Sequence, residues 1–196
     1  CYNVVSLCCY GNTLDLVKIE QELSIKETEL KEKYEDEKLI QLEINDWKNT
    51  TSKRLFLENS FDFKIKSIGV FKNTEILKNA IQIIVNKLKN IIDIYSSSSK
   101  LIKESNIAIS YSFDIILENE DYTIGKIIEF ILYDNYYNKN QTLNYCGFYK
   151  PHPHINISII RIAFKNEEPI ETVQKYIVEA STIAISIYEK LLPQIN

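Results

Sequence analysis

The chain has 196 residues, a formal net charge of −4, a pI of about 5.4 and 26% charged residues. This length suffices for one sizeable domain or two small ones, and the composition is that of a globular protein. The acidic balance argues against autonomous, sequence-specific nucleic-acid binding. No run of apolar residues is long enough for a membrane-spanning helix, so no membrane association is predicted.

The chain contains no Met and begins at Cys1, so we expect a fragment of a longer protein whose N-terminal part is missing. Its four cysteines form no CxxC pair, which excludes the zinc-ribbon and thioredoxin patterns. Cys8 and Cys9 lie in an apolar stretch, and we expect buried thiols in a strand there.

Four segments are predicted before the first long helix. A short buried strand over residues 4–10 ends at Gly11. Residues 15–42 are dense in Glu and Lys and predict a solvated helical excursion with a small buried face. A polar connection over residues 45–53 follows. Apolar and polar residues then alternate with period two, which predicts a half-buried strand over residues 61–71.

A long helix is predicted from Glu75 to Tyr95, because Asn73 and Thr74 supply helix-start chemistry. Its apolar residues recur every three or four positions and form one stripe. The stripe comprises Leu77, Ile81, Ile84, Leu88, Ile91 and Tyr95. We expect this stripe to pack against a sheet and against another helix. The serines at 96–99 then predict a flexible linker.

The second half starts with a strand predicted over residues 108–117 and a helix capped by Asp121 or Thr123. Gly125 falls in the first turn of this apolar helix, where glycine costs stability. Glycine is tolerated where another backbone approaches closely, so we expect an interface here and not an active site. A surface loop is predicted over residues 135–142.

Two strands over residues 143–149 and 155–164 follow, joined by a Pro-His-Pro-His turn. Acidic residues and Pro169 open the last helix. This helix carries a second apolar stripe with the same spacing. The stripe comprises Ile170, Val173, Ile177, Ala180, Ala184, Ile187 and Leu191.

No catalytic constellation is present in the sequence. His152 and His154 flank Pro153 without a third ligand motif, so a rigid turn is predicted there and not a metal site. Helix capping accounts for the acids at Glu120 and Asp121. P-loop, dinucleotide-fingerprint, HExxH and GxSxG motifs are absent. We therefore predict no catalytic residue, no cofactor and no metal in this chain.

The chain resembles itself. Phe71-Lys72-Asn73 leads from a predicted strand into a long striped helix, and Phe164-Lys165-Asn166 does the same. Neither helix could leave its stripe in water without associating. The repeat predicts a pseudo-dimer within one chain, with the two long helices facing each other.

Residues 106–192 resemble the smaller alpha-like subunit of cellular DNA-directed RNA polymerases. The resemblance is carried by Glu120-Asp121-Tyr122-Thr123-Ile124-Gly125, the apolar helix, Gly147-Phe148-Tyr149 and the His152-Pro153 turn. The family pattern has Leu and Asn where Ile124 and Lys126 stand here. Residues 1–95 resemble the C-terminal half of the larger alpha-like subunit. A chain that carries both of these regions resembles the fused alpha-like subunit of large nucleocytoplasmic DNA viruses.

The resemblance implies an α+β fold of two dimerization modules, each an antiparallel sheet with long helices packed on one face, that form an intrachain pseudo-dimer. It implies an incomplete large-subunit module over residues 1–95, a linker over 96–105 and a small-subunit dimerization module over 106–196. It implies a non-catalytic platform on which the two largest polymerase subunits and others assemble for transcription, while those partners perform nucleotidyl transfer. Localisation would be the virion and host cytoplasm for a viral protein, and otherwise the nucleus. The alternative is a stand-alone α+β dimerization module unrelated to transcription.

The stripes and the resemblance together predict sixteen interface residues. They are Leu77, Ile81, Ile84, Leu88, Ile91, Asp121, Thr123, Gly125, Ile128, His152, Pro153, Val173, Ile177, Ala180, Ala184 and Ile187.

Overall fold

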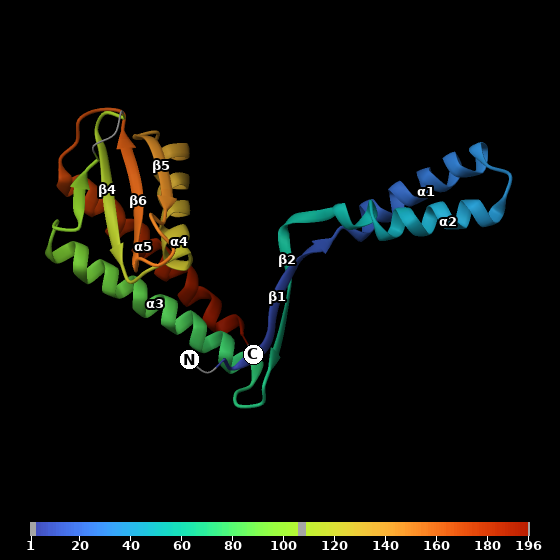
Figure 1. The fold of residues 1–196 in the computed structure, drawn as a ribbon, viewed down its shortest axis with the longest axis horizontal. Coiled ribbons are helices and arrows are strands. Elements are labelled where there is room, and N and C mark those ends of the chain that lie inside the picture. Colours follow the sequence, from blue (N-terminus) through green and yellow to red (C-terminus); the bar gives the residue numbers. More distant parts are fainter. Residues whose placement is uncertain (1–2, 106–108, 196) are drawn as a thin grey trace. The chain divides into compact units, whose positions relative to one another are not determined.

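The computed structural model describes residues 3–105 and 109–195. Over these residues the chain is an α+β protein with two antiparallel sheets and five α-helices, which confirms the predicted fold class at this level (Figure 1). The chain divides into two compact units between Asn73 and Thr74. Cys1 and the predicted strand start at Ala108 lie outside the described residues.

The sheet of unit 1 is a two-stranded ribbon. Strand β1 (Val5–Leu14) pairs antiparallel with β2 (Phe56–Ser67). The predicted strand end at Gly11 is wrong, because Gly11 lies inside the ladder opposite Asp62. The second strand also ends before the predicted residue 71, since Gly69 turns the chain with a φ of +101°.

Two helices form a hairpin between these strands, α1 (Leu16–Lys33) and α2 (Glu37–Asn49), and a 3-10 turn η1 (Ser52–Arg54) follows. Asp15 and Asp36 cap them by accepting hydrogen bonds from backbone N–H groups of their first turns. The sequence prediction of a polar connection over residues 45–53 is wrong at its start. Helix α2 continues to Asn49, past the buried Ile44.

Unit 2 is built on a four-stranded antiparallel sheet with the order β3-β4-β6-β5. The strands are β3 (Ile102–Glu104), β4 (Ser112–Glu118), β5 (Leu143–Tyr149) and β6 (Ile157–Phe164). Strand β5 has the predicted bounds, and β6 lies within the predicted ones. Strand β4 ends at Glu118, one residue beyond its predicted end. Sequence reasoning missed β3, which is too short to show a periodicity.

The core of unit 2 lies between this sheet and three helices, α3 (Asn73–Ser97), α4 (Tyr122–Leu132) and α5 (Ile170–Leu191). A 3-10 turn η3 (Leu192–Gln194) follows α5. Figure 1 shows α3 and α5 on one side of the sheet. None of the described helices is both long enough and apolar enough to cross a membrane.

Helix α3 belongs to unit 2. Its buried face places Leu88, Ile91 and Tyr95 in the same core as β4, β6 and α5. The predicted domains instead assign this helix to residues 1–95 and put a linker at 96–105. The compact units of the structure divide before α3, because the stripe of this helix packs against the sheet that follows it in sequence.

The predicted loop over residues 135–142 is wrong for most of its length, because a π-helix η2 (Tyr133–Lys139) continues α4. Tyr136 is buried and stacks on Tyr176, with 3.7 Å between the ring centroids. Its hydroxyl donates a short hydrogen bond to the Glu179 carboxylate. Burial is the larger cause of the raised pKa of Tyr136, and this hydrogen bond is the second cause. These contacts with α5 hold the segment helical.

The thiols of the two units differ in environment. Cys8 and Cys9 are exposed, so their predicted burial is wrong. Cys146 is partly buried, and its thiol donates to the Glu129 carbonyl at 3.7 Å. Burial raises the pKa of the Cys146 thiol from 9.0 to about 12, and the Glu129 carboxylate adds to the rise.

We predict that iodoacetamide at mildly alkaline pH alkylates Cys8 and Cys9 in the native protein and alkylates Cys146 at least about 100-fold more slowly, because the thiolate is the reactive form. Mass spectrometric peptide mapping over time measures the three rates. In denaturant the three thiols should react alike. A native Cys146 as reactive as Cys8 would contradict the described burial.

Candidate interaction surface

Most of the predicted interface residues are buried in the core of unit 2. Eight of their side chains are at most 5% exposed: Ile81, Leu88, Ile91, Ile128, Val173, Ile177, Ala180 and Ala184. Ile84 is half-buried and packs against the same core. These side chains hold the unit together, and Ala184 also lines the groove described below.

Four predicted residues remain at the surface on α4, α3 and α5. Asp121 caps α4 as predicted, and its Oδ1 accepts a hydrogen bond from the Thr123 N–H at 3.0 Å. Thr123 is exposed. Leu77 and Ile187 are 39% and 48% exposed, so each helix stripe continues beyond the core at one end.

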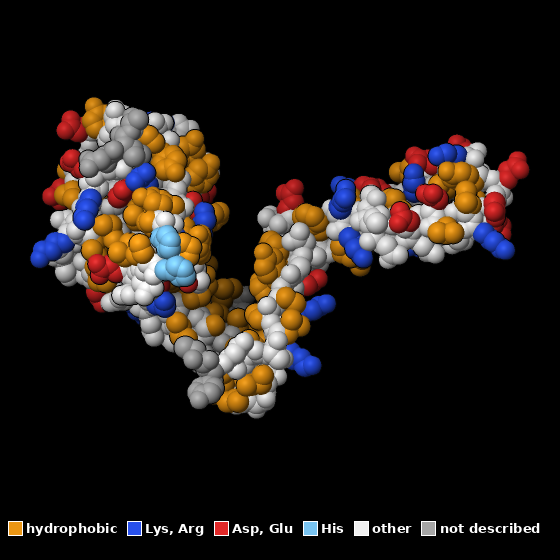
Figure 2. All heavy atoms as spheres, in the orientation of Figure 1, with side chains coloured by type: hydrophobic (Ala, Val, Ile, Leu, Met, Phe, Trp, Pro, Cys, Tyr) orange, Lys and Arg blue, Asp and Glu red, His pale blue; other side chains and the backbone are white. Residues whose placement is uncertain are grey.

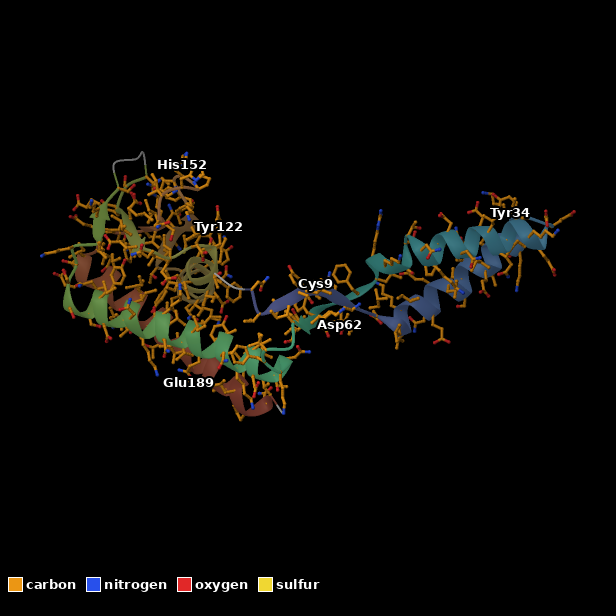
Figure 3. The ribbon with its side chains drawn as sticks, turned by 60° about the horizontal axis from the view of Figure 1, so that its bottom comes forward. Cys9, Tyr34, Asp62, Tyr122, His152 and Glu189 are labelled. Carbon is orange, nitrogen blue, oxygen red and sulfur yellow. The ribbon has the colours of Figure 1, made fainter. Side chains whose placement is uncertain are left out.

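His152 and Pro153 lie in the exposed turn between β5 and β6, and Figure 2 shows both histidines at the surface among hydrophobic side chains. The His154 N–H donates to Nδ1 of His152 at 3.2 Å. Figure 3 places His152 on the same side of unit 2 as Tyr122. Within residues 3–105 and 109–195, no group of three or more His, Cys, Asp or Glu side chains could hold a metal ion.

Gly125 allows a close approach, but from a side chain of its own unit. A Cβ at this position would lie 1.9 Å from a ring carbon of Phe148 on β5. The same ring makes an edge contact with Tyr122, with 5.2 Å between the centroids. The close approach expected from another backbone at Gly125 is therefore made by the Phe148 side chain, where α4 packs onto β5.

An apolar groove of about 440 Å³ lies between α4 and α5. Its lining residues are Lys126, Ile127, Phe130 and Ile131 from α4, and Ala184, Ile187, Tyr188 and Leu191 from α5. Phe130 is 68% exposed and Leu191 is 40% exposed, so the groove opens to the surface. Burial raises the pKa of the Tyr188 hydroxyl. The groove has the chemistry of a site for another apolar segment.

Of these groove residues, sequence reasoning named Ala184 and Ile187 as interface residues and placed Leu191 in the apolar stripe of the last helix. A usable signal was present, because α4 has apolar residues on more than one face. Ile124, Ile128 and Leu132 face the core, while Ile127 and Phe130 extend the apolar surface around the helix. A helix that is apolar on most sides buries those sides only if a further element or another molecule packs against it in addition to one sheet.

The long helices of the two sequence repeats contact each other inside unit 2. The Gln174 side-chain amide at the start of α5 donates to the Tyr95 carbonyl at the end of α3, at 3.0 Å. Lys89 and Glu189 form an exposed ion pair at 3.7 Å. Both helices also contribute to one core. They therefore run in opposite directions against the same sheet.

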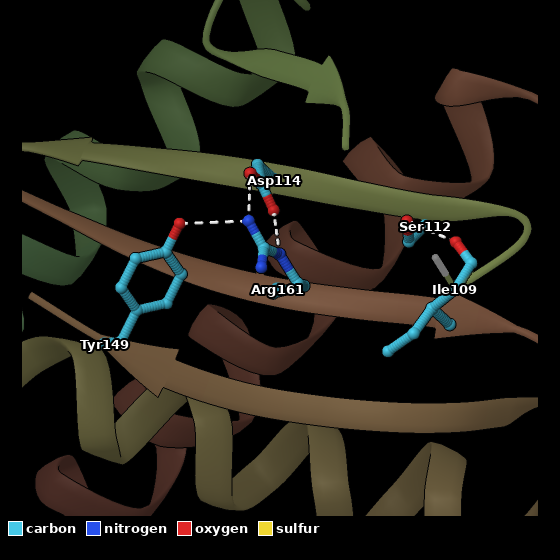
Figure 4. A network of polar contacts seen from close by, with 5 residues as sticks. All are labelled: Ile109, Ser112, Asp114, Tyr149 and Arg161. Atoms are coloured by element: carbon cyan, nitrogen blue, oxygen red, sulfur yellow. Dashed lines mark hydrogen bonds and ion pairs between the residues drawn. The ribbon is translucent and has the colours of Figure 1, made fainter. Parts of the chain in front are cut away.

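The outer face of the sheet carries a polar network (Figure 4). Arg161 on β6 donates two hydrogen bonds to the Asp114 carboxylate on β4, at 2.6 and 2.7 Å, and a third to the Tyr149 hydroxyl at 3.0 Å. The hydrogen bond to Asp114 raises the pKa of Arg161. Arg161 and Asp114 lie directly opposite in the ladder, so the pair fixes strand register.

No protein-family model and no curated protein matches this chain.

We predict that Gly125→Ala destabilises the protein by about 1 kcal/mol or more, because overpacking against Phe148 costs ~1–3 kcal/mol and the gain in helix propensity is only ~1 kcal/mol. Urea unfolding measures the change. In a Phe148→Ala background the same substitution should become neutral or stabilising. Gly11→Ala is the matched control, since its Cβ would meet no atom within 4 Å. Equal effects at both glycines would refute the packing account.

Proposed function

We propose that this chain is a non-catalytic, alpha-like subunit of a multisubunit DNA-directed RNA polymerase, of the fused kind found in large nucleocytoplasmic DNA viruses. It would act as the assembly platform for the two largest subunits. Nucleotidyl transfer would take place in those partners, and no residue of this chain would take part in the chemistry.

The observation that carries the proposal is that α3 and α5 line one shared core. Each helix follows the same Phe-Lys-Asn segment, and each packs its apolar stripe into one shared core. An intrachain pseudo-dimer of two alpha-like modules requires such a seam between the helices of its two repeats. The Gln174–Tyr95 hydrogen bond joins the ends of the helices at this seam.

The groove between α4 and α5 supports a platform role. It is formed by the helix that carries the polymerase-like motif from Glu120 to Gly125, and its apolar lining is open at Phe130 and Leu191. An exposed apolar surface of this kind favours a protein partner over a polar small molecule. Localisation would follow the polymerase, in the virion and host cytoplasm for a viral protein and otherwise in the nucleus.

A stand-alone dimerization module is the second candidate, because the groove would serve a second copy as well as a polymerase subunit. The two candidates differ in the size and identity of the bound partners.

We predict that the tagged protein, expressed in its native host system, co-purifies with two very large polymerase subunits. Phe130→Glu should weaken their recovery by about 30-fold, the effect of losing ~2 kcal/mol at a buried aromatic anchor. Quantitative mass spectrometry of the eluate measures both. Phe130 is already exposed, so the variant should keep the native fold.

Ile25→Glu on α1 is the matched control, because Ile25 is a 59% exposed apolar residue outside the groove. Its recovery of partners should equal that of the parent. Recovery of the protein alone, or only with copies of itself, would sink the polymerase assignment and favour the dimerization module.

A further inference from the structure

The ribbon of unit 1 has one apolar face and one charged face. The residues paired across the apolar face are Cys8 with Ile65, Tyr10 with Phe63, and Asn12 with Phe61. The opposite face carries Lys66, Lys64 and Asp62. Tyr10 and Phe63 are 68% and 69% exposed although their rings contact each other. A two-stranded ribbon with such a face is marginally stable in water.

The ribbon repeats the cross-strand pairs of β5 and β6. On the inner face a Cys–Ile pair is followed by an aromatic residue opposite a large apolar one. On the outer face a small residue lies opposite a cation. These pairs are Cys8–Ile65, Tyr10–Phe63 and Cys9–Lys64 in the ribbon, and Cys146–Ile162, Phe148–Ile160 and Gly147–Arg161 in the sheet. Residues 63–65 of β2 therefore correspond to residues 160–162 of β6.

The correspondence shows what β2 lacks. Strand β6 is paired on both edges, with β5 on one side and β4 on the other. Over residues 3–105 and 109–195, β2 pairs with β1 alone. One group on the other edge of β2 is occupied, because the Asn73 side-chain amide donates to the Ile65 carbonyl at 3.1 Å. The rest of an unpaired strand edge presents N–H and C=O groups that can template another strand, and a bound strand would displace this amide.

Charge defines the strand that would fit. Strand β4 places Asp114 directly opposite Arg161 and apolar Phe113 and Ile115 on either side of it, opposite Ile162 and Ile160. Lys64 stands at the position of Arg161 and is exposed. It makes no ion pair within the described part of the chain. A strand seated on this edge can supply the missing acid.

We propose that the free edge of β2 accepts an antiparallel β-strand from a partner polypeptide, with apolar side chains opposite Phe63 and Ile65 and an acidic side chain opposite Lys64. Backbone hydrogen bonds supply the binding, the apolar positions extend the exposed face, and the Lys64 pair sets the register. The inference rests on the strand pairing and not on the polymerase assignment.

The test uses a fluorescent peptide with the β4 sequence Ser112–Glu118 and the intact chain. We expect saturable binding by fluorescence anisotropy and slower hydrogen exchange of β2 amides in the complex. Lys64→Glu should weaken binding about fivefold, because opposite charges across a ladder attract and like charges repel. A peptide carrying Asp114→Lys should bind the Lys64→Glu protein as well as the original pair binds.

Lys66→Glu is the matched control, because the correspondence puts it opposite the serine of the peptide and its change in charge is the same. Its affinity for the peptide should stay within about twofold of the parent's, a smaller change than the loss of a direct charge pair causes. Absence of saturable binding, equal losses for the two lysine variants, or failure of the charge exchange would overturn the proposal. Self-association of the chain that Lys64→Glu abolishes would assign the edge to a second copy and overturn it too.

Discussion

Strand β6 is hydrogen-bonded along both of its edges, and the organisation of unit 2 depends on this double pairing. Its inner residues Ile160 and Ile162 are fully buried beneath the helices, while Arg161 on the outer face is held by Asp114 of the neighbouring strand. Pairing on both sides leaves β6 no exposed backbone edge, so the apolar face can close into a core.

The ribbon of unit 1 has similar cross-strand pairs but, within the described residues, lacks a neighbour on the second edge of β2 and a core of helices over its apolar face, so most of its side chains stay exposed. Cys8 and Cys146 occupy corresponding positions, yet one is exposed and the other is partly buried with a raised pKa. The residue type and its cross-strand Ile partner are the same. The difference therefore comes from the layers around the strand, which supply burial that a ladder alone cannot.

Features that depend on local periodicity could be predicted from the sequence, and features that depend on distant contacts could not. The stripes located α3 and α5, and Asp121 was recognisable as the cap of α4. The π-helix after α4 depends on Tyr136 stacking on Tyr176 some forty residues later. Likewise, the periodicity of α3 indicates that it must be buried but not which sheet buries it. The close approach at Gly125 depends on Phe148, which no local pattern connects to it.

A helix in a two-layer unit needs one apolar face, so apolar residues beyond that face are available for another molecule. Phe130 on α4 and Leu191 on α5 are such residues, and they meet at one groove. The free edge of β2 offers a second kind of surface, where backbone groups would carry the binding and side chains would choose the partner. Under the proposed assembly function, side-chain shape would select the partner at the groove, whereas register and charge would select it at the edge. Specificity at the groove would then depend on residues that the core leaves exposed, and specificity at the edge would depend on Lys64, an exposed residue outside the core.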